Sequence, residues 1–323
     1  MAATVGFSKF VESLLLGSAK FHEHHDIGLR EPQSEVSVWL HGLGAPRDVT
    51  DVNVMVAAHP LTIGIGLSDA DRQAAAIAGR ASLQFRWQRS GVLLGELRLA
   101  WTDSSCAGGA TLGLFLVGRS RHYCLPRPWR WRYSMWREYT RWTSNKRSGI
   151  RLSRRESAGV AVFYLCPRPV ALVSVMDGAV GNVFPMDLIG PIGGDVFSLA
   201  LRPTSAGVPL IGRSGHLALS TVPVVQAAVA YALGRNHRTP FVGTRDLPFD
   251  TMTSAALGLP VPRFALRVRE LQVLRSETMG SHRQFLCRVM RDTKYGDGLQ
   301  LFIAHGLYQA WPRRGTPNDT PRA

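Results

Sequence analysis

The chain has few acidic side chains and few cysteines. It contains 23 Asp and Glu residues against 38 Lys and Arg residues, and its four cysteines are widely spaced over 323 residues, with no CxxC pair. This spacing argues against a structural zinc site and against a disulfide framework. It fits a reducing compartment, so we expect a cytoplasmic protein.

Long apolar runs and the common catalytic motifs are also missing. No window of 18 uncharged apolar residues occurs, so we expect no transmembrane helix. There is no HExxH pair and no GxxxxGK(S/T) phosphate loop, and the glycines at 64–66 and 193–194 lack the strand–GxGxxG–helix context of a dinucleotide fold. A zincin protease, a P-loop nucleotidase and a Rossmann domain are therefore excluded as interpretations.

The positive charge of the chain is concentrated in one segment. Between Arg119 and Arg155, twelve Lys and Arg residues stand against one acid, Glu138, so this segment carries eleven of the fifteen net positive charges. Its centre, residues 129–147, is dense in Arg and Trp and predicts an amphipathic helix. The alternating residues are Trp129, Arg130, Trp131, Arg132, Trp136, Arg137, Arg141 and Trp142.

The length favours two domains and a mainly β (α+β) fold class. Residues 1–118 are expected to form a small β-rich module of unknown role, because alternating apolar and polar residues predict strands at 35–41, 82–87 and 95–101. A buried strand is expected at 111–117, and a helix at 68–77 with Ser68 as its N-cap. The basic connector then covers 119–158, a second β-rich domain covers 159–315, and 316–323 form a flexible tail.

The C-terminal half has its own sequence of strand and turn signals. An apolar segment around a proline turn, 164–175, precedes a turn at Asp177-Gly178 and a second strand segment, 181–189. The strands 196–202 and 216–221 follow. A helix is expected at 224–233, ended by Gly234.

This order resembles the FMN-binding split barrel of the flavin reductase family. The matching motifs are an RPV-x-LVS opening strand at 168–174, an N-x-x-P second strand at 182–185, and an Arg plus Ser/Thr loop. The resemblance implies that Arg202, Thr204 and Ser205 hold the flavin phosphate or ribityl chain. It implies that Asn182, Pro185 and Met186 lie along the flavin ring. The motif Gly280-Ser281-His282 matches a Gly-Asp-His motif of the family except at Ser281. It implies that His282, the one catalytic candidate, lies near the flavin and the nicotinamide.

The resemblance implies a flavin reductase-like oxidoreductase with FMN (or FAD) and NAD(P)H as cofactors. Hydride transfer from nicotinamide to flavin needs no protein general base, so the missing acid–base motifs are compatible with this function. The resemblance also implies a homodimer with the flavin at the subunit interface, and a partner oxygenase that takes the reduced flavin. Another split-barrel activity, the oxidation of a small amine or of a phosphorylated substrate, is an alternative.

The basic connector suggests a second class of function. Arg side chains interleaved with indole rings can bind nucleic acid, which makes a non-catalytic binding or regulatory protein the main alternative. The same segment could lie on an anionic membrane surface. It could also be a helix that packs its Trp face on one domain, with Arg stems over apolar surface.

Overall fold

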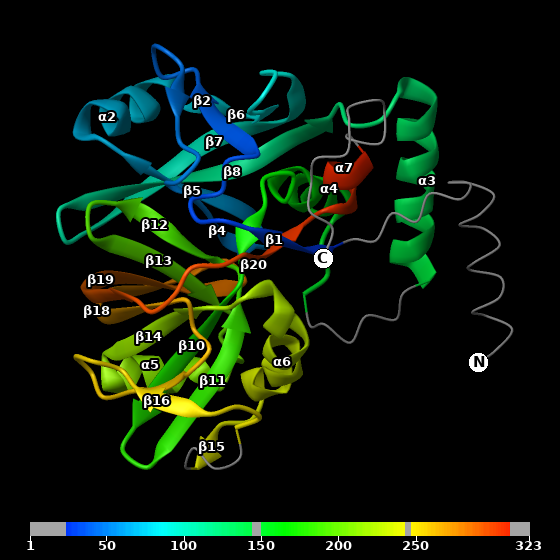
Figure 1. The fold of residues 1–323 in the computed structure, drawn as a ribbon. Coiled ribbons are helices and arrows are strands. Elements are labelled where there is room, and N and C mark those ends of the chain that lie inside the picture. Colours follow the sequence, from blue (N-terminus) through cyan, green and yellow to red (C-terminus); the bar gives the residue numbers. More distant parts are fainter. Residues whose placement is uncertain (1–23, 144–149, 243–246, 311–323) are drawn as a thin grey trace, which may run out of the picture.

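The computed structural model describes residues 24–143, 150–242 and 247–310, and it confirms the mainly β fold. Two large antiparallel sheets lie one above the other, the N-terminal one in blue to cyan and the C-terminal one in green to orange (Figure 1). The predicted tail, residues 316–323, lies outside the described residues.

The N-terminal sheet has seven strands in the order β3-β2-β6-β7-β8-β5-β4. The three strands expected from alternation and the buried strand expected at 111–117 are present, whereas β3, β4 and β5 were not predicted. Strands β7 and β8 are longer than predicted and form one long hairpin around Gly108-Gly109. The strands are β2 (Val36–His41), β3 (Arg47–Asp48), β4 (Asn53–Ala58), β5 (Leu61–Leu67), β6 (Arg80–Trp87), β7 (Leu93–Ala107) and β8 (Ala110–His122).

Helix α2 (Asp69–Ala78) confirms the prediction made from its N-cap. Ser68 accepts a hydrogen bond from the amide of Asp71, and the Asp71 carboxylate accepts one from the amide of Ser68, which completes a capping box. Gly79 ends the helix at φ 64°, a left-handed conformation that glycine adopts without strain.

The C-terminal sheet has eight strands in the order β12-β13-β19-β18-β14-β10-β11-β15. Ile189 on the edge strand β12 and Phe184 on β11, near the other edge, belong to the same buried cluster, so the sheet curls around one core. The strands are β10 (Ala171–Asp177), β11 (Val180–Met186), β12 (Ile189–Gly193), β13 (Val196–Leu201), β14 (His216–Thr221), β15 (Phe241–Val242), β18 (Arg267–Met279) and β19 (His282–Lys294).

Two strand predictions in this half need correction. The segment 164–175 is not one strand: Tyr164 ends helix α4 (Arg154–Phe163), and the extended residues are divided between the short strand β9 (Arg168–Pro169) and β10, which begins at Ala171. The segment 181–189 is divided between β11 and β12. The chain leaves β11 after Met186, and the side chain of Asp187 turns to the hydroxyl of Tyr164, 2.6 Å away.

The prediction of one helix over 224–233, ended by Gly234, is also wrong. The segment forms the short elements η1 (Val224–Gln226), α6 (Ala227–Ala232) and η2 (Leu233–His237), and Gly234 lies inside η2. The tighter 3₁₀ turn of η2 brings Asn236 against β11, where its side-chain amide donates to the carbonyl of Val183 at 2.8 Å.

The remaining elements join the two halves or cover them. Strands β1 (His25–Leu29), β20 (Gln300–Ala304) and β9 (Arg168–Pro169) form a small sheet. A two-stranded sheet contains β16 (Thr251–Thr253) and β17 (Pro260–Pro262), and α5 (Gly207–Ser214) packs on β10. Residues of α4 and of α7 (Gly306–Ala310) are buried in the core of the N-terminal sheet.

The basic connector forms α3 (Arg127–Thr143), which confirms a helix in this segment. Trp129 and Trp136 pack against the N-terminal core, Arg132 lies over the ring of Trp129, and Trp131 is 64% exposed. These contacts favour the packing interpretation for most of the helix. The side chains of Arg141 and Trp142 lie outside the described residues.

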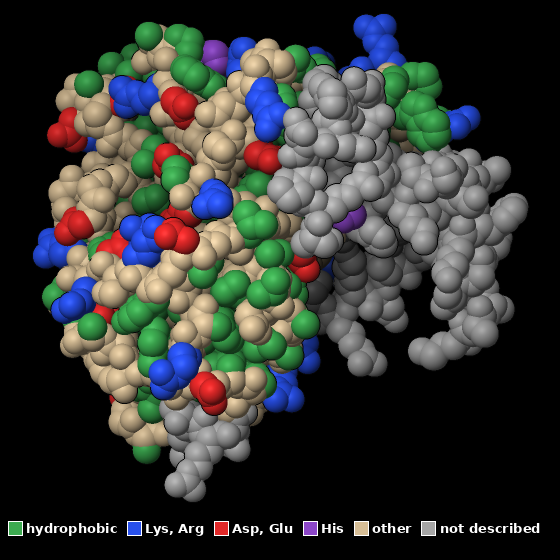
Figure 2. All heavy atoms as spheres, viewed as in Figure 1, with side chains coloured by type: hydrophobic (Ala, Val, Ile, Leu, Met, Phe, Trp, Pro, Cys, Tyr) green, Lys and Arg blue, Asp and Glu red, His purple; other side chains and the backbone are tan. Residues whose placement is uncertain are grey.

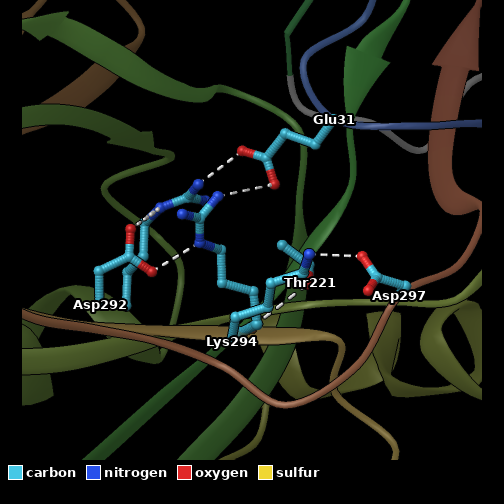
Figure 3. A network of polar contacts seen from close by, with 7 residues as sticks. Glu31, Thr221, Asp292, Lys294 and Asp297 are labelled. Carbon is cyan, nitrogen blue, oxygen red and sulfur yellow. Dashed lines mark hydrogen bonds and ion pairs between the residues drawn. The ribbon is translucent and has the colours of Figure 1, made fainter.

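Charged side chains of both signs are mixed on the surface. On the part of one face that the described residues form, Lys and Arg alternate with Asp and Glu (Figure 2). A network in Figure 3 illustrates this, because Arg267 and Arg269 lie between Glu31 and Asp292 and form ion pairs of 2.5–3.6 Å with both. This network fastens the loop after β1 to the hairpin of β18 and β19. None of the helices in the described ranges is long and apolar enough to cross a membrane.

Candidate functional site

The loop after β13 carries the residues expected to hold a phosphate. Arg202 and Thr204 are exposed, whereas Ser205 is buried. The amide of Ser205 donates to the carbonyl of Arg202 at 2.9 Å, and the amide of Val208 donates to the carbonyl of Ser205 at 3.0 Å. The loop is therefore a tight turn that leads into α5, and two of its amides are already used within it.

His237, which the sequence analysis missed, covers this turn. Its carbonyl accepts from the amide of Ala206 at 2.8 Å, and its Nδ1 lies 3.3 Å from the Ser205 hydroxyl. Its Nε2 lies 3.0 Å from the carbonyl of Pro185. A carbonyl only accepts, so Nε2 carries the proton and Nδ1 accepts from Ser205. His237 thus links Ser205 to Pro185, two residues that the motifs had proposed separately.

The side chains of Asn182 and Met186 point into the protein. Asn182 is fully buried, and its amide donates to the carbonyl of Asn236 at 2.7 Å. Together with the bond from Asn236 to Val183, this forms a clamp that holds η2 on β11. Met186 belongs to the C-terminal core. Neither side chain is available to a ligand, so these two positions could contribute only through their backbone.

His282 begins β19 and is buried, with 4% of its surface exposed. Its Nδ1 lies 2.9 Å from the Ser281 hydroxyl and 3.4 Å from the amide of Ala58. Burial, and then the positive charge of Arg202, lowers the pKa of His282 to about 4. The imidazole is therefore neutral at pH 7.

Arg202 acts on both histidines. Burial lowers the pKa of His237, and the Arg202 charge lowers it further, although the bond to Pro185 opposes this shift. Among the described residues Arg202 forms no ion pair. The structure thus brings Arg202, Ser205, Pro185, His237 and His282 into one neighbourhood, with one cation and two neutral imidazoles.

The N-terminal half contributes the other wall of this neighbourhood. The amide of Ser281 donates to the carbonyl of His59 at 2.6 Å, and the amide of His59 donates to the Ser281 hydroxyl at 2.9 Å. The His59 ring lies 2.7 Å from the Glu156 carboxylate. Burial would raise the pKa of Glu156, but hydrogen bonds from Ser153 and His59 outweigh it and hold that pKa below its usual range.

The side chain of Asp187, the acid that follows the motif residues on β11, is held by a hydrogen bond. Asp187 follows Met186 and accepts from the hydroxyl of Tyr164 at 2.6 Å. Burial and the Asp187 charge raise the pKa of Tyr164 well above its ordinary value, so the phenol keeps its proton and the bond persists at neutral pH.

These residues fit a phosphorylated flavin only in part. Arg202 and Thr204 could bind a phosphate, because a guanidinium and a hydroxyl are exposed on the same turn. Ser205 is already bound to His237, so a ligand would have to displace that bond to reach its hydroxyl. Nδ1 of His282 accepts from the amide of Ala58, so Nε2 carries the proton and could donate a hydrogen bond to a ligand.

Comparisons with known proteins find related structures but no related family. No protein-family model and no curated protein matches the chain. An FMN-binding protein from Thermus thermophilus is 21% identical to this chain and superposes with a TM-score of 0.35. The match covers 40% of this chain and 72% of the Thermus protein. An NADH:FAD oxidoreductase from Streptomyces globisporus is 18% identical, with coverages of 49% and 91% and a TM-score of 0.40. The styrene monooxygenase flavin reductase from Pseudomonas putida is 15% identical, with coverages of 44% and 88% and a TM-score of 0.37. At these values the likeness says nothing about the ligand or reaction of this chain.

Proposed function

We propose that the protein binds FMN through the turn after β13 and transfers a hydride from NAD(P)H to it. The observation that carries this proposal is the unpaired charge of Arg202. The guanidinium depresses the pKa of two buried histidines, His237 and His282, and forms no ion pair among the described residues. An anion bound there would compensate this charge, and a phosphate is the anion that the neighbouring hydroxyl of Thr204 suits.

In this function the residues bind and orient, and the flavin supplies the redox chemistry when bound. Arg202 and Thr204 would hold the phosphate. His282 is neutral at pH 7 and would offer a ring nitrogen to the flavin or to the nicotinamide without adding a charge. The same reduced flavin could be passed to a partner oxygenase.

Titration of FMN, followed by flavin fluorescence, tests the phosphate contact. Arg202→Ala should weaken FMN binding by about 1.5–3 kcal/mol, the usual contribution of a charged hydrogen bond, which is roughly a 10- to 150-fold rise in Kd. The control is Arg213→Ala, because Arg213 is exposed on the adjacent helix α5 and is paired with Asp177 instead.

Riboflavin, which lacks the phosphate, sharpens this experiment. Its affinity should be equal for the wild type and Arg202→Ala, because Arg202 is proposed to contact only the phosphate. An equal loss for FMN and riboflavin would remove Arg202 from the phosphate site. Bleaching of bound FMN by NADH or NADPH under anaerobic conditions then tests hydride transfer. A protein that binds FMN but does not bleach would keep the site and lose the reductase function.

A further inference from the structure

The two large sheets share one strand order. Without its edge strand β15, the C-terminal sheet read from that edge has the order β11-β10-β14-β18-β19-β13-β12. The N-terminal sheet has the order β3-β2-β6-β7-β8-β5-β4, and the strands at equivalent places in the two sheets also follow one another in the same order along the chain. Helix α2 follows β5, and α5 follows the matching strand β13. Only β15, a two-residue strand at one edge, has no counterpart.

The likeness extends to single residues of the ladders. The hairpin of β7 and β8 has an extra residue at Thr102 and another at Gly118. The hairpin of β18 and β19 has its extra residues at Leu274 and Met290, each 172 positions later (274 − 102 and 290 − 118). In the first hairpin the paired residues run from Gly95–His122 to Ala107–Ala110. For each of these pairs, the two residues that lie 172 positions later are also paired in the second hairpin.

The edge strands and helix ends repeat as well. Strand β4 has an extra residue at Val56 in its ladder with β5, and β12 has one at Ile192 in its ladder with β13. Gly79 ends α2 and its carbonyl accepts from the amide of Trp101 at 3.0 Å. Gly215 ends α5 in the same conformation, and its carbonyl accepts from Val273 at 2.8 Å. Bulges and left-handed caps are specific backbone features, so this agreement is not expected of two unrelated sheets.

We infer that the chain contains two copies of one barrel, fused and facing each other as an intramolecular pseudo-dimer. The contacts are reciprocal, as in a two-fold interface: β4 lies against β12 and β13, and β12 lies against β4 and β5 (Figure 1). The buried cluster between the sheets pairs equivalent residues, Val56 with Ile192 and Leu114 with Leu286.

The backbones approach closely at this interface. A Cβ atom on Gly66 would overlap the carbonyl oxygen of Ile192, and a Cβ on Gly190 would come within 2.7 Å of Val54. Glycine is therefore required at Gly66 by the opposite copy rather than by its own conformation.

This arrangement creates two equivalent seams between the copies. At one seam the turn between β18 and β19 meets the turn between β4 and β5, and at the other the turn between β7 and β8 lies beside the turn between β12 and β13. At the first seam, Gly280-Ser281 lies on the turn of His59, beside Arg202 and His282. At the second, a hollow of about 330 Å³ is lined by Gly108-Gly109 and Gly193-Gly194. We call these the His282 seam and the glycine seam.

The two seams differ in charge. The position of Arg202 is taken in the other copy by Ser68, and that of His282 by Ala110, as their ladder registers show. At these two positions the His282 seam has a cation and an imidazole, and the glycine seam has neither. The pseudo-dimer has one anion site per chain, and its second wall, the turn of His59, comes from the N-terminal copy. The part of this inference that concerns the ligand rests on the proposed FMN binding.

Light scattering after gel filtration tests the pseudo-dimer without any ligand. We expect a mass of 35.5 kDa at micromolar concentration, because each copy already buries the face of the other. A stable species of twice that mass would overturn the inference. Isothermal titration with FMN should give one site per chain, whereas two sites would show that the glycine seam also binds. A 35.5 kDa chain that does not bind FMN would leave the pseudo-dimer intact and refute the proposed function alone.

A pair of glycine variants tests the packing between the copies. Gly66→Ala should lower the urea midpoint of unfolding clearly, because the new methyl group meets backbone of the other copy. Gly212→Ala is the matched control, since a Cβ there has no neighbour within 4 Å, and its midpoint should not fall. Equal midpoints for the two variants would contradict the close approach of the copies.

Discussion

The protonation of His282 gives a direct test of the site. In the free protein its pKa is about 4, below the ordinary value of about 6.5, because burial and the Arg202 charge disfavour the imidazolium. A phosphate bound beside Arg202 would oppose that charge and raise the pKa of His282. FMN binding should therefore be accompanied by proton uptake at low pH.

The magnitude follows from these pKa values. At pH 5 the free imidazole is roughly one-tenth protonated, and an imidazole with its ordinary pKa is almost fully protonated. The phosphate opposes the Arg202 charge but not the burial, so the uptake by His282 is above zero and below about 0.9 proton per FMN. At pH 8 the imidazole is neutral in both states and the uptake should vanish. The same difference in pKa corresponds to roughly 3 kcal/mol between the two protonation states.

Calorimetry in buffers of different ionisation enthalpy measures the proton count. The phosphate of FMN also titrates, with a second pKa near 6, so the quantity to compare is the difference between the wild type and His282→Asn. We expect the wild type to take up more protons at pH 5, and the two proteins to agree at pH 8. The same proton count for both at pH 5 would refute a phosphate beside His282. In the absence of ligand, the lowered pKa means that the free energy of unfolding falls as the pH decreases from about 6.5 to about 4, and His282→Asn should flatten that decrease.

Three further predictions concern stability. Arg168→Met should destabilise the protein by about 2–4 kcal/mol in urea unfolding, because the buried guanidinium joins the start of the C-terminal half to β4. It donates to the backbone carbonyl of Asn53 at 3.0 Å and to Oδ1 of Asn53 at 2.5 Å. A change below about 0.5 kcal/mol would mean that these bonds do not contribute to stability. Glu270→Gln should cost about 1.5–3 kcal/mol, since this buried carboxylate accepts from Ser254 Oγ at 2.6 Å and from two backbone amides, and an unchanged melting temperature would count against it. Arg213→Ala should cost less than about 1 kcal/mol, because its ion pair with Asp177 is exposed, and a larger loss in the same assay would contradict the low value of surface pairs.

Much of the fold could be predicted from local patterns. Alternation identified three strands of the N-terminal half, β2, β6 and part of β7, and the N-cap Ser68 marked the start of a helix that the structure contains. Strand β14 was predicted with the bounds that it has. The errors fall where tertiary contacts decide. Asp187 breaks a continuous apolar segment because Tyr164 lies opposite it, and η2 tightens because Asn236 reaches β11.

The candidate site was less predictable, because its contacts join distant segments. His237 lies 32 residues from Ser205 and 52 from Pro185, in a stretch with no motif, so no local signal indicates it. Asn182 matches a binding motif, yet η2 covers that face of β11 and turns its side chain into a structural clamp. The family resemblance proposed Arg202 and His282 for one site, but it could not show that His59 faces them from the other half.

The duplication was hidden for a related reason. In the two long hairpins, only five of 26 equivalent strand positions are identical, among them Leu114 with Leu286 and Arg119 with Arg291. What the copies share is the position of bulges, turns and left-handed caps, which different side chains can satisfy. A comparison of residues along the sequence therefore does not detect the duplication.

Fusion of the two copies explains how the seams can differ. In a homodimer every residue occurs at both seams, so Arg202 and His282 would appear twice, and a substitution that suits one seam would also alter the other. In a single chain the constraint is lifted: Ser68 serves as the N-cap of α2 at the position where the other copy has Arg202, and Ala110 stands where the other copy has His282. The N-terminal copy could thus lose its own anion site and keep its role as the wall of the other. The module without a recognisable motif would then act as the built-in partner of the copy that has one.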